Sequence, residues 1–220
     1  MTMKKKNYIL SIIVAVILIG CDAHKYDAED HGLQPKQILC SDGKTYSLRD
    51  CQTLNKKPFA VVFYKDEANL TDGAGYAVYL WDISPECFAD SIGVIQKTSS
   101  NINGYDGMTN TYELIANKEV ESPMATSVYS LLPHGQQAFI PSVAEMRLLH
   151  NARDIINPII KECGGDTLPI EPENSWYWTS TEVEGHETLS AWLYSLNSGL
   201  YLATLKTQAH KIRPIVMLRY

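Results

Sequence analysis

Residues 139–149 have the sequence FIPSVAEMRLL, and this stretch decides how the middle of the chain folds. Ser142 is followed three residues later by Glu145, which is the spacing of a capping box: the serine side chain accepts a hydrogen bond from a first-turn amide, and the glutamate reaches back to the serine N–H. Met146 and Leu149 then begin an apolar stripe at helical spacing. The stretch therefore predicts a helix that starts at Ser142 and packs one face against a core.

Further helices are predicted on both sides of this one. Residues 108–118 carry apolar side chains at helical spacing, and residues 123–132 begin with a proline, which the first turn of a helix tolerates. Residues 155–163 form another helix, which the glycines at 164–165 terminate. Pro158 predicts a break or a fresh start there, because proline lacks the N–H that a helix interior needs.

Strands are predicted toward both ends of the chain. Residues 37–40 and 44–48 flank an Asp-Gly pair at 42–43 and predict a hairpin. β-branched and aromatic residues predict buried strands at 59–64 (FAVVFY) and 75–83 (GYAVYLWDI). In the C-terminal quarter, alternating patterns predict strands at 176–180, 189–196, 200–207 and 210–218.

The order of these elements predicts the fold class. Asn-Ser-Gly at 197–199 predicts a tight turn between two of the C-terminal strands, and Pro214 predicts a bulge or an unpaired edge in the last one. Strands, then helices, then strands predict an α+β fold with mixed or antiparallel sheets and two or more helices in the middle of the chain. The two ends of the chain are expected to meet in one sheet system.

The N-terminus has the pattern of an export signal. Three lysines at 4–6 precede an apolar run at 9–19, which is shorter than the roughly 20 residues that span a bilayer. Residues 18–21 (LIGC) resemble the lipobox of bacterial lipoproteins. This resemblance implies that residues 1–20 are a signal peptide and that Cys21 carries acyl chains such as palmitate, which anchor the protein to a membrane. The alternative is a signal cut elsewhere, with Cys21 a bystander.

Two segments follow the signal. Residues 21–34 are short, polar and acidic, which predicts a flexible tether, and residues 35–220 are expected to form a single domain. The acidic residues after Cys21 resemble the surface-export signals of Bacteroides-type lipoproteins. The expected location is therefore the outer membrane or the cell surface, while the side of the membrane that the anchor faces is left open.

The charge of the chain excludes one class of partner. Removal of residues 1–20, which hold three lysines and no acid, changes the formal net charge from −6 to −9. A chain this acidic lacks the basic footprint of a nucleic-acid-binding protein. The expected partners are a lipid membrane, through acylated Cys21, and a glycan or protein ligand, but no nucleic acid.

Four cysteines follow Cys21, namely Cys40, Cys51, Cys87 and Cys163. Export permits disulfides, and four cysteines allow three connectivities. A turn lies between Cys40 and Cys51, which favours a disulfide between these two, while free buried thiols fit Cys87 and Cys163 equally well. No Cys-x-x-Cys pair or Cys/His cluster has metal-ligand spacing, so no metal is expected.

Several motifs occur in an order that resembles one family. The most specific are IPSVAEM (140–146), WYWTSTE (176–182) and KIRPIV (211–216). They resemble motifs of a domain of unknown function that is common in Bacteroides-type lipoproteins and close to the Fibrobacter-type major paralogous domain. The resemblance covers residues 55–219, and it implies a C-type-lectin-like fold.

This family is related to formylglycine-generating domains, which depend on reactive cysteines. No cysteine pair occurs in the C-terminal strands of this chain, its histidines are isolated, and no nucleophile elbow occurs. The chain is therefore expected not to be an enzyme. Trp176 and Trp178 are expected to share a strand face that packs above the Ser142 helix, and Arg213 to extend toward that helix or a neighbouring loop.

The sequence predicts no cofactor, and a bound calcium ion is the alternative. C-type lectins bind sugar through calcium with Glu-Pro-Asn and Trp-Asn-Asp motifs. Residues 171–174 (EPEN) are not that motif, and no Trp-Asn-Asp follows. Glu171, Glu173 and Asn174 carry oxygens of the kind that calcium prefers, but a solvated loop stiffened by proline is the favoured interpretation.

The C-terminal strands carry the residues expected to bind a ligand, because lectin-like domains present this half to partners. Aromatic side chains with small polar neighbours suit both sugars and protein surfaces. The candidate residues are Tyr177, Trp192, Tyr194, Asn197, Ser198 and Tyr201. Alternation along 189–196 places Trp192 and Tyr194 on one face, where they form either an exposed binding patch or a second core layer.

Three functions fit these features. The favoured one is a membrane-anchored, non-enzymatic recognition or adhesion module for a glycan or protein ligand. The second is a surface receptor diversified by a retroelement, with variable residues near the C-terminus at 194–201. The third is a structural envelope lipoprotein without a dedicated ligand.

Overall fold

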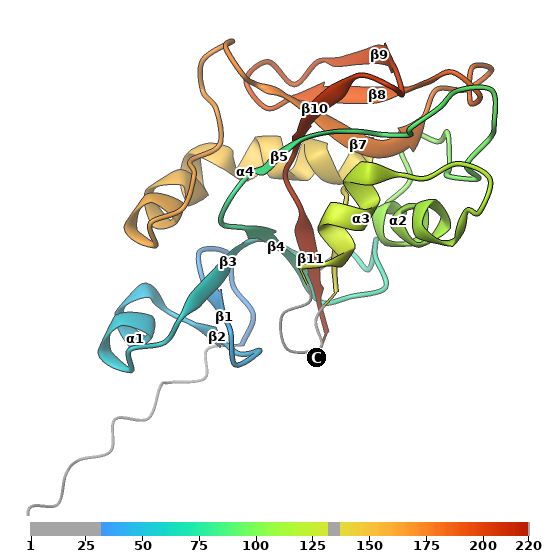
Figure 1. The fold of residues 1–220 in the computed structure, drawn as a ribbon. Helices are drawn as coiled ribbons and strands as arrows, with labels where there is room; N and C mark the ends of the chain where they lie inside the picture. The colour runs from blue at the N-terminus through green and yellow to red at the C-terminus, as the bar shows by residue number, and fades with distance from the viewer. Residues whose placement is uncertain (1–31, 132–136, 220) are drawn as a thin grey trace, which may run out of the picture.

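A computed structural model describes residues 32–131 and 137–219, whose strands form two sheets (Figure 1). The first sheet contains, in spatial order, β2 (Thr45–Tyr46), β1 (Ile38–Cys40), β3 (Pro58–Lys65), β4 (Gly75–Tyr79), β11 (Ile215–Leu218) and β6 (Ala138–Phe139). The second contains β5 (Ile83–Cys87), β10 (Ala209–Ile212), β7 (Trp176–Glu182), β8 (Ser190–Ser195) and β9 (Tyr201–Leu205). The helices are α1 (Leu48–Thr53), α2 (Gly107–Ala116), α3 (Pro123–Tyr129) and α4 (Val143–Glu162).

Several predictions fall outside the described residues. These are the signal peptide at 1–20, Cys21, most of the tether at 21–34, and the last residue of the helix predicted at 123–132. The described part of that helix already ends at Tyr129. Within residues 32–131 and 137–219, no helix is both long and apolar enough to cross a bilayer.

The N-terminal hairpin is confirmed and forms one end of the first sheet. β1 pairs antiparallel with β2 and, on its other side, with β3. β3 contains the predicted run at 59–64, and it pairs antiparallel with β4. The sheet is completed from the other end of the chain, because β11 pairs antiparallel with β4. The two ends of the described chain therefore meet in one sheet, as predicted.

The second sheet consists mainly of C-terminal strands. β7, β8 and β9 pair antiparallel in sequence order, and the predicted turn at 197–199 joins the last two, with Gly199 at a φ of 74°. β10 lies parallel to β7 on its other side and antiparallel to β5. The fold is thus α+β, with mostly antiparallel pairing and helices in the middle of the chain.

Two segments predicted as single strands each divide between the two sheets, so both predictions are wrong in the same way. The run at 75–83 contains β4, a bend at 80–82 and the start of β5. The run at 210–218 contains most of β10 and all of β11, separated by Arg213 and Pro214. Pro214 was expected to cause a bulge or an unpaired edge; instead it lies where the chain leaves one sheet for the other. β4 and β11 are mostly buried, whereas β5 and β10 are mostly half-buried or exposed. The sequence pattern of the first run does not reveal the division, because the apolar residues Leu80 and Trp81 lie in the bend itself.

Helix α4 begins with the predicted capping box, in which Ser142 and Glu145 make both reciprocal hydrogen bonds. The helix then continues without a break through Pro158 to Glu162, so the separate helix predicted at 155–163 does not exist. Pro158 lies on an exposed part of α4, where water can satisfy the carbonyl that a proline leaves unpaired. The predicted stop is correct, with Gly164 at a φ of 72°.

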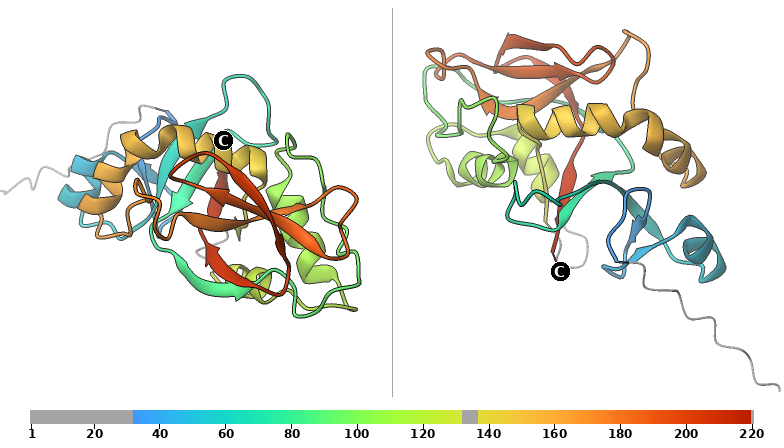
Figure 2. Two further views of the ribbon diagram at one scale, coloured as in Figure 1. Left: turned by 90° about the horizontal axis from the view of Figure 1, so that it is seen from above. Right: turned by 180° about the vertical axis from the view of Figure 1, so that it is seen from behind.

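Helix α4 lies between the two sheets at one side of the molecule, and helices α2 and α3 pack against the sheets at the other side (Figures 1 and 2). Trp178 is fully buried and Trp176 partly buried, both in the cluster that contains Leu114 of α2 and Met124 of α3. The two tryptophans do share a strand face, but that face points away from α4. It is Tyr177 that lies in the α4 cluster, so the predicted packing above the Ser142 helix is wrong.

Candidate functional site

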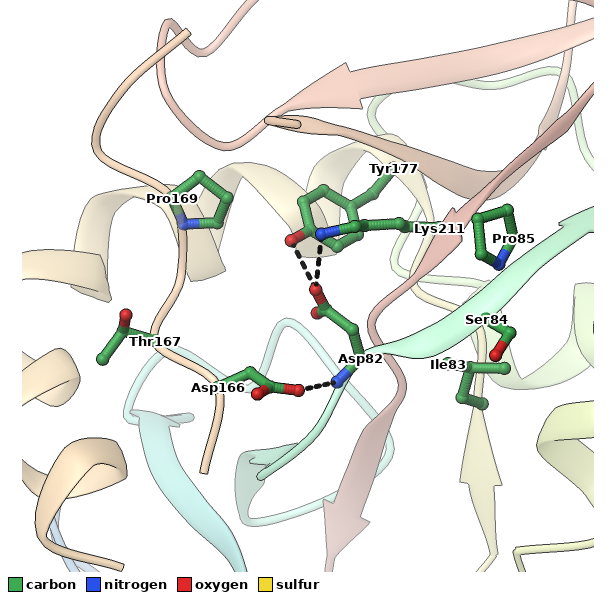
Figure 3. A pocket seen from close by; sticks show the side chains of 9 residues that line it. All are labelled: Asp82, Ile83, Ser84, Pro85, Asp166, Thr167, Pro169, Tyr177 and Lys211. Carbon is green, nitrogen blue, oxygen red and sulfur yellow. Dashed lines mark hydrogen bonds and ion pairs between the residues drawn. The ribbon is translucent and has the colours of Figure 1, made fainter. Parts of the chain in front are cut away.

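A pocket of about 500 Å³ opens where the two sheets adjoin (Figure 3). Its lining residues come from the bend after β4, from β5, from the loop after α4, and from β7 and β10. They are Asp82, Ile83, Ser84, Pro85, Asp166, Thr167, Pro169, Tyr177 and Lys211. The pocket thus opens between the two segments that lead from one sheet to the other, namely the bend after β4 and the end of β10.

Asp82 is the centre of the hydrogen bonding in this pocket. Its carboxylate accepts from the Tyr177 hydroxyl at 3.0 Å, from Lys211 Nζ at 3.1 Å and from Arg213 Nη1 at 2.8 Å. Its backbone N–H donates to Asp166 Oδ2 at 3.1 Å. Figure 3 shows the Asp82 carboxylate directed at Tyr177 and Lys211. A side chain held by three donors has one orientation, so the pocket is preorganised.

Arg213 supports the pocket from inside the protein. Its side chain is fully buried, and Nη2 donates to the carbonyl oxygens of Leu80 at 3.0 Å and Asp166 at 2.6 Å. The loop after α4 can approach this closely because residue 165 is glycine: a Cβ there would lie 2.6 Å from Leu80 O. One arginine thereby joins the bend after β4 to the loop after α4.

The charges of the pocket cancel. Asp82 and Asp166 contribute two formal negative charges, and Lys211 and Arg213 contribute two positive ones. Burial, reinforced by the Asp82 carboxylate, raises the pKa of Tyr177 above its ordinary value, so its hydroxyl remains a hydrogen-bond donor. The ammonium of Lys211 disfavours a bound cation, and the two carboxylates disfavour an anion. The chemistry therefore suits a neutral polar ligand.

The rim of the pocket adds hydroxyl groups and apolar surface. Ser84 and Thr167 are exposed on opposite sides, and Pro85 and Pro169 lie beside them (Figure 3). Hydroxyls can donate or accept, and proline rings offer flat apolar contacts. A small molecule with several hydroxyl groups and an apolar face matches this combination.

The structure places the sequence-predicted ligand residues in three different environments. Tyr177 is buried, and its hydroxyl reaches the pocket. Tyr194 is 1% exposed and packs against His150 of α4, so it belongs to the core and does not form an exposed patch with Trp192. Trp192 is half-buried and contacts Tyr201 edge-on, with ring centroids 5.1 Å apart. Tyr201 itself is 43% exposed.

The predicted turn residues lie apart from the pocket. Asn197 donates its side-chain amide to Ile170 O, and Ser198 is exposed. Trp192, Ser198 and Tyr201 thus gather around β8, β9 and the turn that joins them, while Tyr177 points elsewhere. The six predicted residues do not form one site.

The cysteines are placed as follows. Cys40 and Cys51 are buried with their sulfurs 3.5 Å apart, and they are not bonded to each other. Cys163 packs partly against the same small cluster, while Cys87 Sγ donates to Thr207 O at 3.0 Å. Residues 171–174 of the EPEN loop are exposed. Among the described residues, no group of three or more His, Cys, Asp or Glu side chains could hold a metal ion.

Sequence reasoning missed most of the pocket. Asp82, Asp166 and Lys211 were not predicted to bind a ligand, while Arg213 was expected to extend toward the Ser142 helix or a neighbouring loop, and it does reach the loop after α4. One signal was present: a charged residue followed by proline in an otherwise apolar C-terminal run must find a buried partner. The identity of that partner, 131 positions away in the chain, could not be inferred from it.

Comparison with known proteins relates the fold to one solved structure. No family model matches the chain, and no curated protein matches it. The crystal structure of a fimbrial protein from Bacteroides ovatus ATCC 8483 matches with a TM-score of 0.61 and 15% sequence identity. The match covers 84% of this chain and 49% of that one, so the chain spans about half the length of the fimbrial protein. At this identity the similarity is one of fold.

Proposed function

We propose that this protein is a cell-surface recognition module without enzymatic activity, held to the outer membrane by acylated Cys21, and that its ligand is a glycan bound in the Asp82 pocket. The observation that carries the proposal is the charge-balanced pocket with hydroxyls and prolines at its rim. A sugar residue is neutral, presents hydroxyls in several directions and has an apolar face. The fold similarity to a fimbrial protein from a Bacteroides species agrees with a surface location.

Recognition without catalysis is supported by how the pocket groups are occupied. Asp82 accepts three hydrogen bonds, so it is not poised to take a proton from a ligand. Tyr177, with its raised pKa, is a donor rather than a base. Groups locked in this way can orient a ligand but are poorly suited to move protons during a reaction.

The C-type-lectin-like fold is part of the same proposal. It is supported by the order of the motifs along the chain and by the return of β11 to β4, which brings the end of the chain into a sheet built by its beginning. The proposal includes no calcium, because Lys211 and Arg213 both form ion pairs with the Asp82 carboxylate and so disfavour a further cation there.

A glycan array probed with the soluble fragment 33–220 tests the proposal. The variant Ser84→Trp places a bulky side chain at the pocket rim, and Ser198→Trp is the matched control on the exposed turn between β8 and β9. We expect binding by the wild type and by Ser198→Trp, and loss of binding by Ser84→Trp. Loss only in Ser198→Trp would move the ligand to the turn.

Two outcomes would replace this proposal with one of the alternatives. No binding to any glycan or to host matrix proteins would favour a structural envelope lipoprotein. A reverse transcriptase gene and an adenine-rich template repeat next to the gene would favour the diversified receptor. Residues 198, 200 and 201 are exposed as that hypothesis needs, but residues 194–196 are buried and would tolerate little variation.

The membrane anchor has its own test. Protease shaving of intact cells should release the domain if Cys21 holds it at the cell surface. In a Cys21→Ser variant, radiolabelled palmitate should no longer be incorporated. Incorporation that persists in the variant would show that the anchor lies elsewhere.

A further inference from the structure

Strand β9 is the last strand of the second sheet, and it is unusually apolar for an edge. In Figures 1 and 2 it lies at the outer margin of the molecule, with no other element beyond it among the described residues. Residues 200–205 have the sequence LYLATL, which contains no charge and no proline. The exposed fractions are 63% for Leu200, 43% for Tyr201, 53% for Leu202 and 45% for Leu205.

The backbone N–H and C=O groups of β9 point alternately toward β8 and toward the open edge of the sheet. Leu200 O accepts from Ser195 N, and Lys206 N donates to Leu189 O, so residues with even numbers face β8. The N–H and C=O groups of Tyr201, Ala203 and Leu205 therefore point outward. Leu205 O also accepts from Gln208 N, which marks the end of the strand.

Such an edge is a template for another strand. Edge strands of soluble proteins are usually protected by lysine, proline, a bulge or a covering loop, because unpaired N–H and C=O groups recruit other chains. The register of β9 with β8 runs without a bulge from Tyr201 to Leu205. Because β9 is an edge strand and carries neither a charge nor a proline, its open side is suited to pairing.

We propose that β9 pairs antiparallel with β9 of a second copy of this chain, about a twofold axis at Ala203. In this register Ala203 faces Ala203 of the partner subunit, and Tyr201 faces Leu205 of the partner subunit. The N–H and C=O groups of Ala203 then bond reciprocally to those of Ala203 of the partner subunit, and Leu205 N–H donates to Tyr201 O of the partner subunit. The two second sheets become one continuous sheet through the dimer.

The side chains favour a second copy over another partner, because the edge is complementary to itself. The smallest side chain, that of Ala203, lies on the axis, where each copy meets its own image. The large side chains of Tyr201 and Leu205 pair on one face, and Leu202 pairs with Thr204 of the partner subunit on the other. Pairs of an aromatic and an aliphatic side chain across strands stabilise a sheet. No like charges meet at the axis.

Cysteine crosslinking of the full chain in membranes tests this register. An antiparallel hydrogen-bonded pair has Cα atoms about 5.5 Å apart, which lies within the range of a disulfide. Ala203→Cys should therefore crosslink to itself on mild oxidation, several-fold more than the wild type. Leu202→Cys is the matched control, since it is also exposed on the same strand but faces Thr204 of the partner subunit.

A second measurement covers the case in which a cysteine perturbs the edge. Ala203→Lys and Ala203→Glu should each be monomeric in analytical ultracentrifugation of the detergent-solubilised full chain, and mixing the two should restore the dimer. Equal crosslinking at positions 202 and 203, or none at either, would overturn the proposal. So would crosslinking of Ala203→Cys to a different protein, or charged variants that remain dimeric alone.

Discussion

The ion pair between Lys206 and Glu182 offers a sharp test of how the second sheet is held together. Lys206 follows β9, Glu182 ends β7, and both side chains are fully buried. Lys206 Nζ donates to Glu182 Oε1 and lies 5.2 Å from the centre of the Phe88 ring. Glu182 Oε1 also accepts from Gln96 N at 3.1 Å. The perturbation is Lys206→Met, which keeps the length of the side chain and removes its charge.

The expected magnitude follows from the burial. Removing one partner of a buried ion pair leaves a charge without compensation and costs about 3–5 kcal/mol, whereas replacing both partners by neutral groups is often close to neutral. Lys206→Met should therefore lower the free energy of unfolding by about 3–5 kcal/mol. The double variant Glu182→Gln with Lys206→Met should lose far less, because glutamine keeps an oxygen for Gln96 N.

Urea unfolding of the wild type, both single variants and the double variant gives a complete double-mutant cycle. Lys118→Met serves as the control, since this lysine is exposed and its loss should change the free energy by no more than about 0.5 kcal/mol. The reasoning is refuted if Lys206→Met lowers the free energy of unfolding no more than Lys118→Met does. It is also refuted if the loss in the double variant equals the sum of the losses in the two single variants.

Two further predictions concern titration and oxidation. Burial raises the pKa of Glu145 from 4.5 to about 7, so the folded state binds a proton more readily than the unfolded state, and stability should fall as pH rises from about 4.5 to 7. The urea midpoint of a Glu145→Gln variant should fall less across this range than that of the wild type. Equal falls in the two proteins would contradict the prediction. Mild oxidation should join Cys40 to Cys51, which mass spectrometry detects as the loss of two hydrogens, and should raise the unfolding free energy by about 2–3 kcal/mol. A Cys51→Ser variant should show neither effect. A disulfide-linked peptide of Cys40 and Cys163 would contradict the predicted pairing.

The sequence predicted the elements that short-range hydrogen bonds define. The capping box of α4, the hairpin at β1 and β2, and the turn at 197–199 all form between residues close in the chain. Helix α1 and the two-residue strand β6 were missed, because each is too short to show a period. The match of local pattern and structure was best where no distant partner was needed.

Distant partners account for the errors. Pro158 ends a helix only if its neighbours cannot tolerate the missing hydrogen bond, and here that part of α4 faces water. Tyr194 alternates as a surface residue of β8 would, yet α4 covers it. Asp82 and Arg213 are far apart in the chain, and their pairing depends on how the two sheets meet.

By itself the sequence determined the α+β class, the boundaries of α4 at its capping box and glycine stop, and the prediction of an exported, acidic, lipid-anchored chain. Only the tertiary structure decided that two apolar runs divide between sheets, that a neutral polar pocket opens at their junction, and that β9 has an open, uncharged edge. The physical reason is that caps and turns are bonded within a few residues. A pocket or an edge is defined by what lies next to it in space, which periodicity does not encode.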